Sequence, residues 1–407
     1  MSIEVRALHT AEERLAALRL FRSAMVGLPA LSDDDAMRLV ATGEPGRAYG
    51  AFHEGLLIGT TESYAGTLTV PGGARVPHAA VTHVGVKPSW SRRGVAKALL
   101  ERQLREARAG GDVLASLRAS TGGLYGRFGY GVATFSATTE IDTRQARLRV
   151  RAQPDAVELV PPGAEWDTMQ HVYRRHPPSR AGAISRPDYW WTHAELRQRG
   201  SATPVYVAAH AGMDGPDGYV RYRAGESDGW FSDRQRTLIV EDFVAESAQT
   251  SADLLGYLLS LDIAQRIVFP AAPVDEPLGW LLENCRDASV CATSDETWLR
   301  ILDTRAALQA RRYGRAGGEG AAVIEVVDPL LDGNRGRFRI SAHGAEPASE
   351  PAQALLGVDT LAALFLGGVR WWQMVRAGRV EVRDAHVIDV LDALFACEPA
   401  PFCGTRF

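Results

Sequence analysis

The residues with the clearest capacity for chemistry lie in the stretch 81–102, VTHVGVKPSWSRRGVAKALLER. Its β-branched beginning predicts a strand that ends before Pro88, because proline cannot donate to a sheet ladder. After a short polar turn, Gly94 precedes a run whose apolar residues recur at the spacing of an amphipathic helix. The first N–H groups of a helix have no partner within it, so the turn and the helix N-terminus together predict an anion-binding site.

Four cationic side chains flank this turn, and they are Lys87, Arg92, Arg93 and Lys97. Lysine occurs at no other position of the chain, whose remaining cations are all arginine. A cofactor with a pyrophosphate group suits such a turn. Two structural interpretations stay open beside it, because glycine turns before helices are common and charge clusters are usually solvated faces.

The segment VGVKPSWSRRGVAKALL resembles the acetyl-CoA-binding motif of the GNAT superfamily of N-acetyltransferases. The residues that match its pattern are Val84, Val86, Pro88, Gly94 and Ala96. Ser91 departs from it, since Gln or Arg is usual there, but this change removes no backbone donor. The resemblance implies that backbone amides of residues 92–96 hold the pyrophosphate and that the strand around Val84 pairs with the pantetheine arm. The cofactor-binding residues expected on this basis are Val84, Gly85, Val86, Arg92, Arg93, Gly94, Val95, Ala96 and Ser120.

A second motif, LYGRFGY at residues 124–130, resembles the fourth helix of the same superfamily. There a tyrosine stands a few residues before a glycine–aromatic pair, and Tyr125 with Gly129 and Tyr130 reproduces this spacing. The resemblance implies that Tyr125 donates a proton to the leaving thiolate, a role that suits tyrosine because its pKa of ~10 keeps it protonated at neutral pH. A backbone N–H near Val84 is the expected oxyanion donor. Without these motifs, Tyr125 would be interpreted as an ordinary packing aromatic.

Length and composition limit the classes of protein to which this chain can belong. Its 407 residues are too many for one ordinary domain, and 46% hydrophobic with 23% charged residues is typical of a soluble globular protein. A net charge of −4 gives no reason to expect nucleic acid as a partner, and no apolar run approaches the ~20 residues of a membrane span. The charged N-terminus lacks a signal-peptide core, so we expect a cytoplasmic location. The four cysteines include no C-x-x-C pair, so we expect free thiols and no metal site.

Around these motifs, hydrophobic periodicity and turn signals predict the element order β-α-α-β-β-β-α-β. The expected strands are 2–6, 50–52, 56–64, 81–87 and 113–118. The expected helices are 11–23, 31–41 and the one that begins at Gly94. This order is that of an acetyltransferase fold, which we assign to residues 1–150.

A stretch rich in Arg, Pro and Gly at 144–162 predicts a domain boundary, and the chain beyond it repeats the first domain faintly. The elements expected there are a hairpin over 205–224, a strand over 237–244 and a helix over 251–262. This copy has no glycine at the turn and carries Glu241, Asp242 and Glu246 nearby, so it should repel a pyrophosphate. We therefore expect a degenerate acetyltransferase-like domain over 151–295 that binds no cofactor.

From about Trp298 the sequence changes to apolar helices over a small sheet. The expected strands are 322–328 and 336–341, and the expected helices are 358–365 and 387–395. This α+β character resembles a sterol-carrier-like fold over residues 296–407, with either a lipid pocket or an ordinary hydrophobic core. Residues 306–320 predict an exposed turn that carries no chemistry.

The three-part arrangement is similar to that of the enhanced intracellular survival (Eis) family. The implied fold class is α/β and α+β, with two GNAT domains in tandem, the second degenerate, and a C-terminal sterol-carrier-like α+β domain. The resemblance implies an N-acetyltransferase with acetyl-CoA as cosubstrate, a hexamer, and a terminal carboxylate, here that of Phe407, that reaches the active site. A free α-carboxylate has a pKa of ~3.5, so it would orient an ammonium group more than deprotonate it. The alternative is that the last residues are frayed.

The acceptor pocket is expected to use the N-terminal segments with Phe21, Met25 and His83, and the acidic run 33–35 is a further candidate. Carboxylate-rich walls suit polyamines such as aminoglycosides. Arg406, however, stands where family members that acetylate aminoglycosides can carry an acid, and a fixed cation there would repel a polycation. We therefore expect transfer to a small polyamine, an aminoglycoside-like amine or a lysine side chain, with weaker or differently placed aminoglycoside acetylation. The alternative function is that of an acyl-CoA-binding sensor or lipid carrier without turnover.

Overall fold

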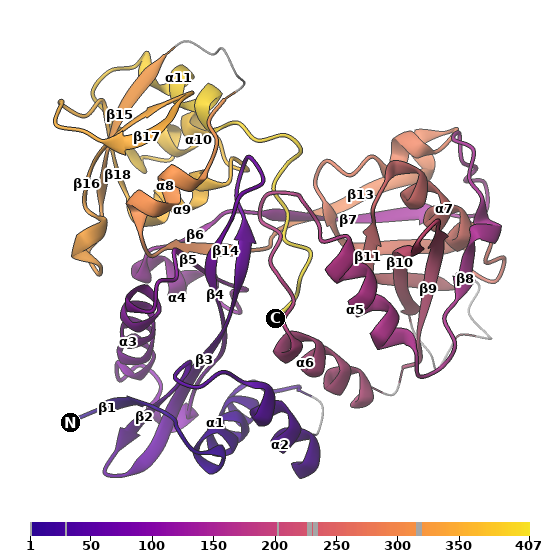
Figure 1. Cartoon of the computed structure of the whole chain (residues 1–407), viewed down its shortest axis with the longest axis horizontal. Coiled ribbons are helices and arrows are strands. Elements are labelled where there is room, and N and C mark those ends of the chain that lie inside the picture. The colour runs from indigo at the N-terminus through magenta and orange to yellow at the C-terminus, as the bar shows by residue number, and fades with distance from the viewer. Residues whose placement is uncertain (1, 29–30, 202, 226–229, 231–234, 315–319) are drawn as a thin grey trace. The chain divides into compact units, whose positions relative to one another are not determined.

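The computed structural model describes residues 2–28, 31–201, 203–225, 230, 235–314 and 320–407. The chain forms two compact units, each built from segments that are distant in the sequence (Figure 1). Unit 1 comprises Met1–Thr134, Arg180–Gly200 and Asp295–Phe407, and unit 2 comprises Phe135–Ser179 and Ser201–Ser294. Every residue for which the sequence predicts a chemical role lies in unit 1.

Unit 1 is built around a sheet whose seven described strands come from both ends of the chain. In spatial order they are β1 (Glu4–Ala7), β2 (Ala48–His53), β3 (Leu56–Thr69), β4 (Arg75–Val86), β5 (Leu114–Leu117), β14 (Trp298–Ile301) and β6 (Tyr130–Val132). The predicted order of the first five strands and three helices is confirmed. β14 inserts between β5 and β6, antiparallel to both, so a strand from the last third of the chain completes the sheet.

Two helices pack on this sheet, α1 (Ala11–Ala24) and α3 (Val95–Ala109), and a further helix, α2 (Asp33–Thr42), packs on α1. α1 begins at a capping box, in which Thr10 Oγ1 accepts from the Glu13 N–H and the Glu13 carboxylate accepts from the Thr10 N–H. The side chain of Ser32 caps α2 in the same way as Thr10 caps α1. Leu99 and Leu104 of α3 are fully buried, which holds the N-terminus of α3 beside β4.

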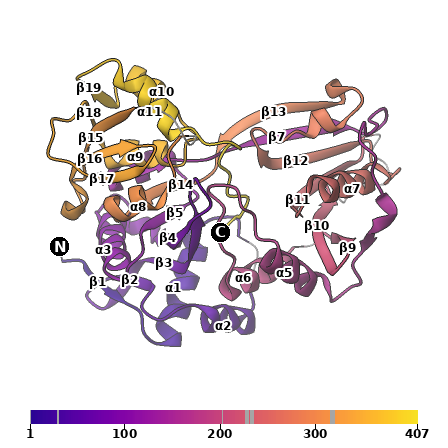
Figure 2. The same ribbon diagram turned by 45° about the horizontal axis from the view of Figure 1, so that its top comes forward.

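A second sheet in unit 1 carries the C-terminal part of the chain (Figure 2). Its strands in spatial order are β17 (Gly344–Pro347), β16 (Gly336–Ser341), β15 (Ala321–Val327), β18 (Ala354–Gly357) and β19 (Val380–Val382). The helices of this part are α8 (Thr304–Ala310), α9 (Val358–Phe365), α10 (Trp371–Arg376) and α11 (Val387–Phe395). The two strands and two helices that the sequence predicts here are confirmed within one or two residues. In α9 the side chains of Leu361, Leu364 and Phe365 are fully buried, and they form the centre of the core.

The expectation of an exposed turn over 306–320 is wrong for its described residues, while 315–319 lie outside them. Arg311 is 2% exposed, and its guanidinium donates to the backbone carbonyls of Phe365 and Phe395. The Arg311 group also lies over the rings of Tyr313 and Phe395. Arginine- and glycine-rich composition predicts exposure, but a guanidinium can be buried where carbonyls and aromatic faces replace water.

Arg300 of β14 and Asp328, which follows β15, join the two sheets of unit 1. Both side chains are fully buried, and Arg300 Nη2 lies 2.7 Å from Asp328 Oδ2. Asp328 also accepts from Asn334 Nδ2 at 2.8 Å and from the Leu330 N–H at 2.9 Å. The carboxylate is thus surrounded by donors, as a buried charge requires.

Removing the Asp328 carboxylate is expected to lower the free energy of unfolding by about 3–5 kcal/mol, because Arg300 would stay buried without its counter-charge. Urea denaturation of Asp328→Ala, followed by tryptophan fluorescence, measures the loss. Asp332→Ala is the matched control, since the Asp332 side chain is 90% exposed and pairs only with Arg335 at the surface among the ion pairs described. The control should keep the wild-type urea midpoint, and equal midpoints for the two variants would contradict the prediction.

Unit 2 holds the repeat of the first domain. Its sheet has the spatial order β13 (Ala288–Asp295), β7 (Phe135–Asp142), β12 (Arg266–Pro273), β11 (Thr237–Ala245), β10 (Gly215–Ala224), β9 (Val205–Gly212) and β8 (Val157–Leu159). Its helices α5 (Glu165–Arg175) and α7 (Ala248–Leu259) carry the core residues that face the sheet. The predicted hairpin, strand and helix are confirmed as β9–β10, β11 and α7. Glu241 near the second turn forms ion pairs with Arg221 and Arg223.

A further helix, α6 (Asp188–Arg199), belongs to unit 1 although the sequence places it after the expected domain boundary. The domain limits 1–150, 151–295 and 296–407 stay predictions. Among the described residues, no helix combines the length and the apolar composition that a membrane crossing requires.

Candidate active site

The predicted cofactor strand, β4, extends beyond its neighbour β5. The two strands pair in parallel only over residues 78–80 of β4. β5 ends at Leu117, whereas β4 continues to Val86 and pairs with β3 along its other edge. Within the described residues, the edge of β4 beyond Ala80 therefore has no strand partner on the β5 side. An extended arm such as pantetheine can pair with such an edge through backbone hydrogen bonds.

A β-bulge interrupts β4 within the motif. The register of β3 against β4 shifts between Thr60 and Glu62. His83 and Val84 of β4 together lie opposite the single β3 residue Thr61. His83 has a φ of 51°, in the left-handed region that few non-glycine residues adopt. Such bulges re-aim a side chain and free backbone groups, and they are frequent beside active sites.

The N-terminus of α3 presents backbone donors without a side-chain cap. Its N-cap Gly94 has a φ of +84°, and a Cβ there would meet no atom within 4 Å. Arg92, with a φ of 61°, and Arg93 are exposed on the same turn, and Arg93 lies 5.2 Å from the centre of the Trp90 ring. Uncapped N–H groups, the helix dipole and two guanidinium groups fit a pyrophosphate.

Tyr125 ends the short helix α4 (Gly122–Tyr125), and its side chain is only 4% exposed. It packs edge-on against Tyr130, and Val84 of the bulge packs on the cluster that contains both rings. Burial raises the pKa of the Tyr125 hydroxyl, and a hydrogen bond with the Ser120 side chain acts in the opposite direction. The hydroxyl therefore stays protonated at neutral pH and can donate.

Four of the predicted residues line one cavity of about 200 Å³, namely Phe21, Met25, His83 and Phe407. The ring of His83 lies 4.5 Å from that of Phe21, measured between centroids. Seven of the twelve lining residues are apolar, so the cavity can bind the apolar part of a small ligand beside the bulge.

Glu62, which the sequence did not single out, anchors His83 from behind this cavity. Its Oε2 lies 2.8 Å from His83 Nδ1 and accepts from the Tyr189 hydroxyl at 3.1 Å. Its Oε1 lies 3.4 Å from Arg14 Nη2. Burial acts to raise the pKa of Glu62, but His83, Arg14 and Tyr189 together hold the pKa below its usual value. Glu62 is therefore a partly buried, ionised carboxylate.

The polar groups of the cavity are mainly basic. Arg22 and Arg197 line it with His83 and His193, and none of its described lining residues is an aspartate or a glutamate. Burial, then the charges of His83 and the two arginines, lower the pKa of His193 well below its usual value, so this ring is neutral. The acidic run 33–35 is not among the lining residues, and its Asp33 pairs with Arg19 on the surface.

The last residues of the chain are held on unit 1 by Glu296, whose side chain is buried. Its carboxylate accepts from the Cys403 N–H at 3.0 Å and from the Gly404 N–H at 2.8 Å. Arg118 bridges the same carboxylate, at 2.8 Å, to the carbonyl of Thr405. These contacts fix the backbone that leads to Phe407.

Arg406 and Phe407 point in different directions from this anchored backbone. The carbonyl of Arg406 accepts from Trp190 Nε1 at 2.7 Å, while its side chain is exposed and is not among the lining residues of the cavity. The Phe407 ring meets Tyr64 edge-on, 5.8 Å between centroids, and lines the cavity. The structure thus brings Phe407, but not the Arg406 side chain, to His83.

Glu296→Ala is expected to release the tail, because two backbone N–H groups and the Arg118 guanidinium would lose their buried acceptor. We expect trypsin to cut after Arg406 at least about tenfold faster than in the wild type. Mass spectrometry of the C-terminal peptide over time measures this rate. Glu346→Ala, which removes an exposed carboxylate of β17, is the control and should leave the rate unchanged. A tail that stays protected in Glu296→Ala would show that other contacts suffice.

Sequence reasoning missed Glu62, Tyr189 and His193 for two reasons. Glu62 lies inside a run of residues that predicts a strand, and a single acidic residue in a strand is usually interpreted as facing solvent. Tyr189 and His193 lie on α6, more than 100 residues beyond the motif strand, so only the fold could bring them to His83. The left-handed φ at His83 has no sequence signal either.

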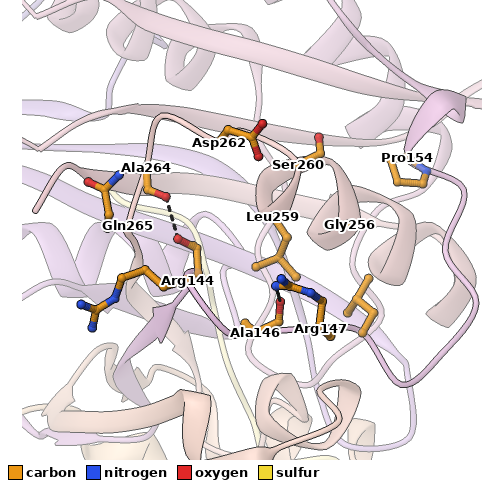
Figure 3. Close-up of a pocket in the computed structure, with 12 residues that line it drawn as sticks. Arg144, Ala146, Arg147, Pro154, Gly256, Leu259, Ser260, Asp262, Ala264 and Gln265 are labelled. Carbon is orange, nitrogen blue, oxygen red and sulfur yellow. Dashed lines mark hydrogen bonds between the residues drawn. The ribbon is translucent and has the colours of Figure 1, made fainter.

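Unit 2 has a hollow of its own, of about 440 Å³, shown in Figure 3. Residues 143–154 and 256–265 line it, so it lies at the C-terminal end of α7. The cofactor turn of unit 1 lies at the N-terminal end of α3, the equivalent helix. The unit 2 hollow is therefore not the counterpart of that turn. Its Arg144 is paired with Asp142, and its Arg147 donates to the carbonyl of Ala146.

Comparison with protein families identifies three matching regions. Residues 4–133 match the acetyltransferase (GNAT) domain, and residues 182–301 match another acetyltransferase (GNAT) domain. Residues 304–404 match the sterol carrier protein domain. Two GNAT domains in tandem with a C-terminal sterol-carrier domain are the fold class that the sequence predicted.

The chain is similar over most of its length to bacterial N-acetyltransferases. It is 37% identical over 364 residues, 86% of each chain, to an uncharacterized N-acetyltransferase of Streptomyces coelicolor. It is 33% identical over 338 residues, 81% of each chain, to N-acetyltransferase Eis of Mycobacterium tuberculosis. Among solved structures, Eis1 from Mycobacterium abscessus has a TM-score of 0.91 at 40% identity, with both chains covered completely. A GCN5-related N-acetyltransferase from Anabaena variabilis, 21% identical with a TM-score of 0.83, shares the fold.

Proposed function

The chain belongs to the Eis family of GNAT N-acetyltransferases, enzymes that use acetyl-CoA, and we propose that its acceptor amine binds in the cavity of Phe21, His83 and Phe407. The observation that carries the proposal is the bulge in β4. The bulge puts His83 in the wall of the cavity and Val84 on the cluster of Tyr125, which supports a reaction centre beside these two residues.

We propose that the residues expected from the motif hold the cosubstrate. The N–H groups of Val95 and Ala96 and the guanidinium groups of Arg92 and Arg93 would bind its pyrophosphate, and the free edge of β4 would pair with its pantetheine arm. Acetyl-CoA supplies the activated acetyl group. The Val84 N–H, freed by the bulge, would stabilise the negative charge that develops on the acetyl oxygen.

Tyr125 would protonate the departing sulfur. Its hydroxyl is buried, its pKa is raised, and it lies in the cluster on which Val84 packs. A donor with a pKa above ~10 stays protonated over the whole pH range in which an amine acceptor can react. Ser120, which hydrogen-bonds it, would orient the hydroxyl.

We propose that the α-carboxylate of Phe407 orients the ammonium group of the acceptor. The anchoring of residues 403–406 and the packing of the Phe407 ring on Tyr64 support this role. A carboxylate of low pKa is a weak proton acceptor, so it contributes position more than proton transfer.

The cavity favours an acceptor with one amine over a polycation. A lysine side chain or a small apolar monoamine suits this small and largely apolar cavity better than a multi-ring aminoglycoside does. Arg22 and Arg197 in the wall, like Arg406 on the tail, repel additional ammonium groups. We therefore propose that aminoglycosides and polyamines are acetylated weakly.

An acceptor panel tests this proposal. Coenzyme A release should be stimulated by a lysine methylamide or an arylalkylamine with a kcat/KM at least about tenfold above that for kanamycin or spermidine. Arg406→Glu should raise kcat/KM for kanamycin a few-fold and leave the monoamine unchanged. A wild-type preference for kanamycin would contradict the size and charge argument.

The family resemblance also suggests a homo-oligomer, and we propose a hexamer. Sedimentation equilibrium should then give six times the 44.1 kDa of the chain. A monomeric mass would contradict it. A cytoplasmic location stays a prediction, which fractionation of the source cells can test.

A further inference from the structure

We infer that Glu62 and His83 act as a proton-accepting pair, in which Nε2 of His83 removes the proton of the acceptor ammonium and Glu62 positions the ring. This inference rests on the proposed function and deepens it, because it assigns the proton transfer that the Phe407 carboxylate is too weak a base to perform. His83 is the catalytic residue of the pair, and Glu62 is the positioning residue.

The hydrogen bond between the two residues determines which nitrogen can act. A carboxylate only accepts, so His83 Nδ1, 2.8 Å from Glu62 Oε2, must carry the proton of the neutral ring. The lone pair is then on Nε2, and the ring lines the amine cavity. Glu62 is itself fixed by Arg14 and by the Tyr189 hydroxyl, so the orientation of the ring is specified from three elements.

The backbone at His83 supports a functional role. A φ of 51° is unfavourable for a histidine, and the strain costs stability that ordinary packing would not require. The bulge turns this side chain toward Phe21, while the next residue, Val84, packs toward Tyr125. Proton acceptor, oxyanion donor and proton donor are thus arranged around two consecutive residues.

Several charged and titratable groups face this pair from the elements packed against it. They are Arg14 and Arg22 of α1, Tyr189, His193 and Arg197 of α6, and Phe407, the residue that carries the terminal carboxylate and lines the same cavity. Among these groups, Phe407 is the competing candidate for the base. Any pH profile must therefore be compared between variants of His83 and of Phe407.

The proton balance of the transfer is complete with these residues. The acceptor ammonium gives one proton to His83 Nε2, and its lone pair then forms the C–N bond to the acetyl carbon as the C–S bond breaks. The sulfur takes a proton from Tyr125, and the second proton lost by the nitrogen restores that hydroxyl. The products are the amide, the coenzyme A thiol and the proton that His83 later releases to solvent.

The left-handed backbone at residue 83 determines which substitutions of His83 can test the inference without disturbing the fold. Glycine and asparagine both adopt this φ without added strain, so His83→Gly and His83→Asn should keep the bulge. Both should lower kcat/KM for a monoamine at pH 7 by about 10²-fold or more, with an unchanged Kd for acetyl-CoA. Imidazole should restore at least about tenfold of the activity of His83→Gly, which has room for it, and little of that of His83→Asn. His343→Gly, at an exposed position, controls for effects of imidazole on the assay.

The pH profile separates a base from a merely structural residue. In the wild type, kcat/KM should fall as pH decreases, because a protonated Nε2 cannot accept the ammonium proton, and this acidic limb should be lost in His83→Asn but kept when Phe407 is deleted. Glu62→Gln should displace the limb and reduce kcat more than it changes KM. Variants of His83 that keep the limb, or a His83→Gly variant that imidazole does not restore, would overturn the inference and leave the proposed function standing. A wild-type chain that no amine stimulates would overturn the proposed function itself.

Discussion

Replacing Tyr125 with phenylalanine is expected to lower kcat by about 10²- to 10⁴-fold, the range that loss of a positioned proton donor produces. The hydroxyl is buried and its pKa is raised, so it is a donor whose loss water cannot easily replace. Binding of acetyl-CoA should persist, because Tyr125→Phe removes one oxygen atom and keeps the ring packing. Steady-state release of coenzyme A, combined with calorimetric titration of acetyl-CoA, separates the two effects.

Tyr130→Phe is the matched control for this variant. The two rings meet edge-on, and the Tyr130 hydroxyl is fully buried without a hydrogen-bond partner among the described residues. Removing that unsatisfied group should leave kcat unchanged and keep or slightly raise the melting temperature. If both tyrosine variants lost activity equally, packing of the cluster would explain the loss, and the assignment of Tyr125 as the proton donor would fail.

Ala96→Glu is expected to weaken acetyl-CoA binding at least about 100-fold while leaving the fold intact. Ala96 lies in the first turn of α3, where the pyrophosphate is proposed to bind, and a carboxylate there occupies and neutralises the anion site. The same carboxylate interacts favourably with the helix dipole, so the variant should be no less stable than the wild type. Loss of binding without loss of stability is therefore the specific result to expect, and calorimetry with thermal denaturation measures both.

Ala109→Glu provides the same change at the other end of the same helix. Ala109 is exposed in the last turn of α3, where an acid is slightly unfavourable and no ligand is proposed. This control should bind acetyl-CoA like the wild type and melt at the same or a slightly lower temperature. Normal binding by Ala96→Glu would place the pyrophosphate elsewhere.

The first domain could be predicted because its signals are local. β-branched runs, the proline at residue 88 and the helical spacing after Gly94 are read within one segment. α3 formed where these signals placed it, and β4 ends where they predicted but begins earlier, at Arg75. The two motifs also led to the proposed cofactor turn and to Tyr125 as the proposed proton donor. A faint internal repeat indicated the second GNAT domain, and the resemblance of the last part to a sterol-carrier-like fold added the third domain.

The contacts between distant segments could not be predicted. β14 pairs with β5, which lies about 180 residues earlier in the chain, and no hydrophobic periodicity predicts such a pairing. The same is true of α6 beside His83 and of Glu296 beneath the tail. Arg311 was placed on the surface because its burial depends on carbonyls and rings supplied by other segments.

The candidate site shows the same division. His83 was singled out as a wall of the acceptor pocket, but its bond to Glu62 depends on the register of β3 against β4 at the bulge. Arg406 drew attention by its position in the sequence. In the structure its side chain is exposed and does not line the cavity, whereas Arg22 and Arg197 do. The charge of the site depends on the side chains that the fold brings to the cavity wall, and these are not the ones nearest to the motif residues in sequence.

The most direct test of the account is transfer of a labelled acetyl group from acetyl-CoA to a monoamine by the wild-type chain, measured as acetylated amine per coenzyme A released. We expect many turnovers with a ratio near one, a loss of at least about 100-fold in Tyr125→Phe and in His83→Gly, and recovery of activity in His83→Gly with imidazole. Binding of acetyl-CoA without acetylated amine, for every amine offered, would contradict it and would favour a sensor or carrier of acyl-CoA.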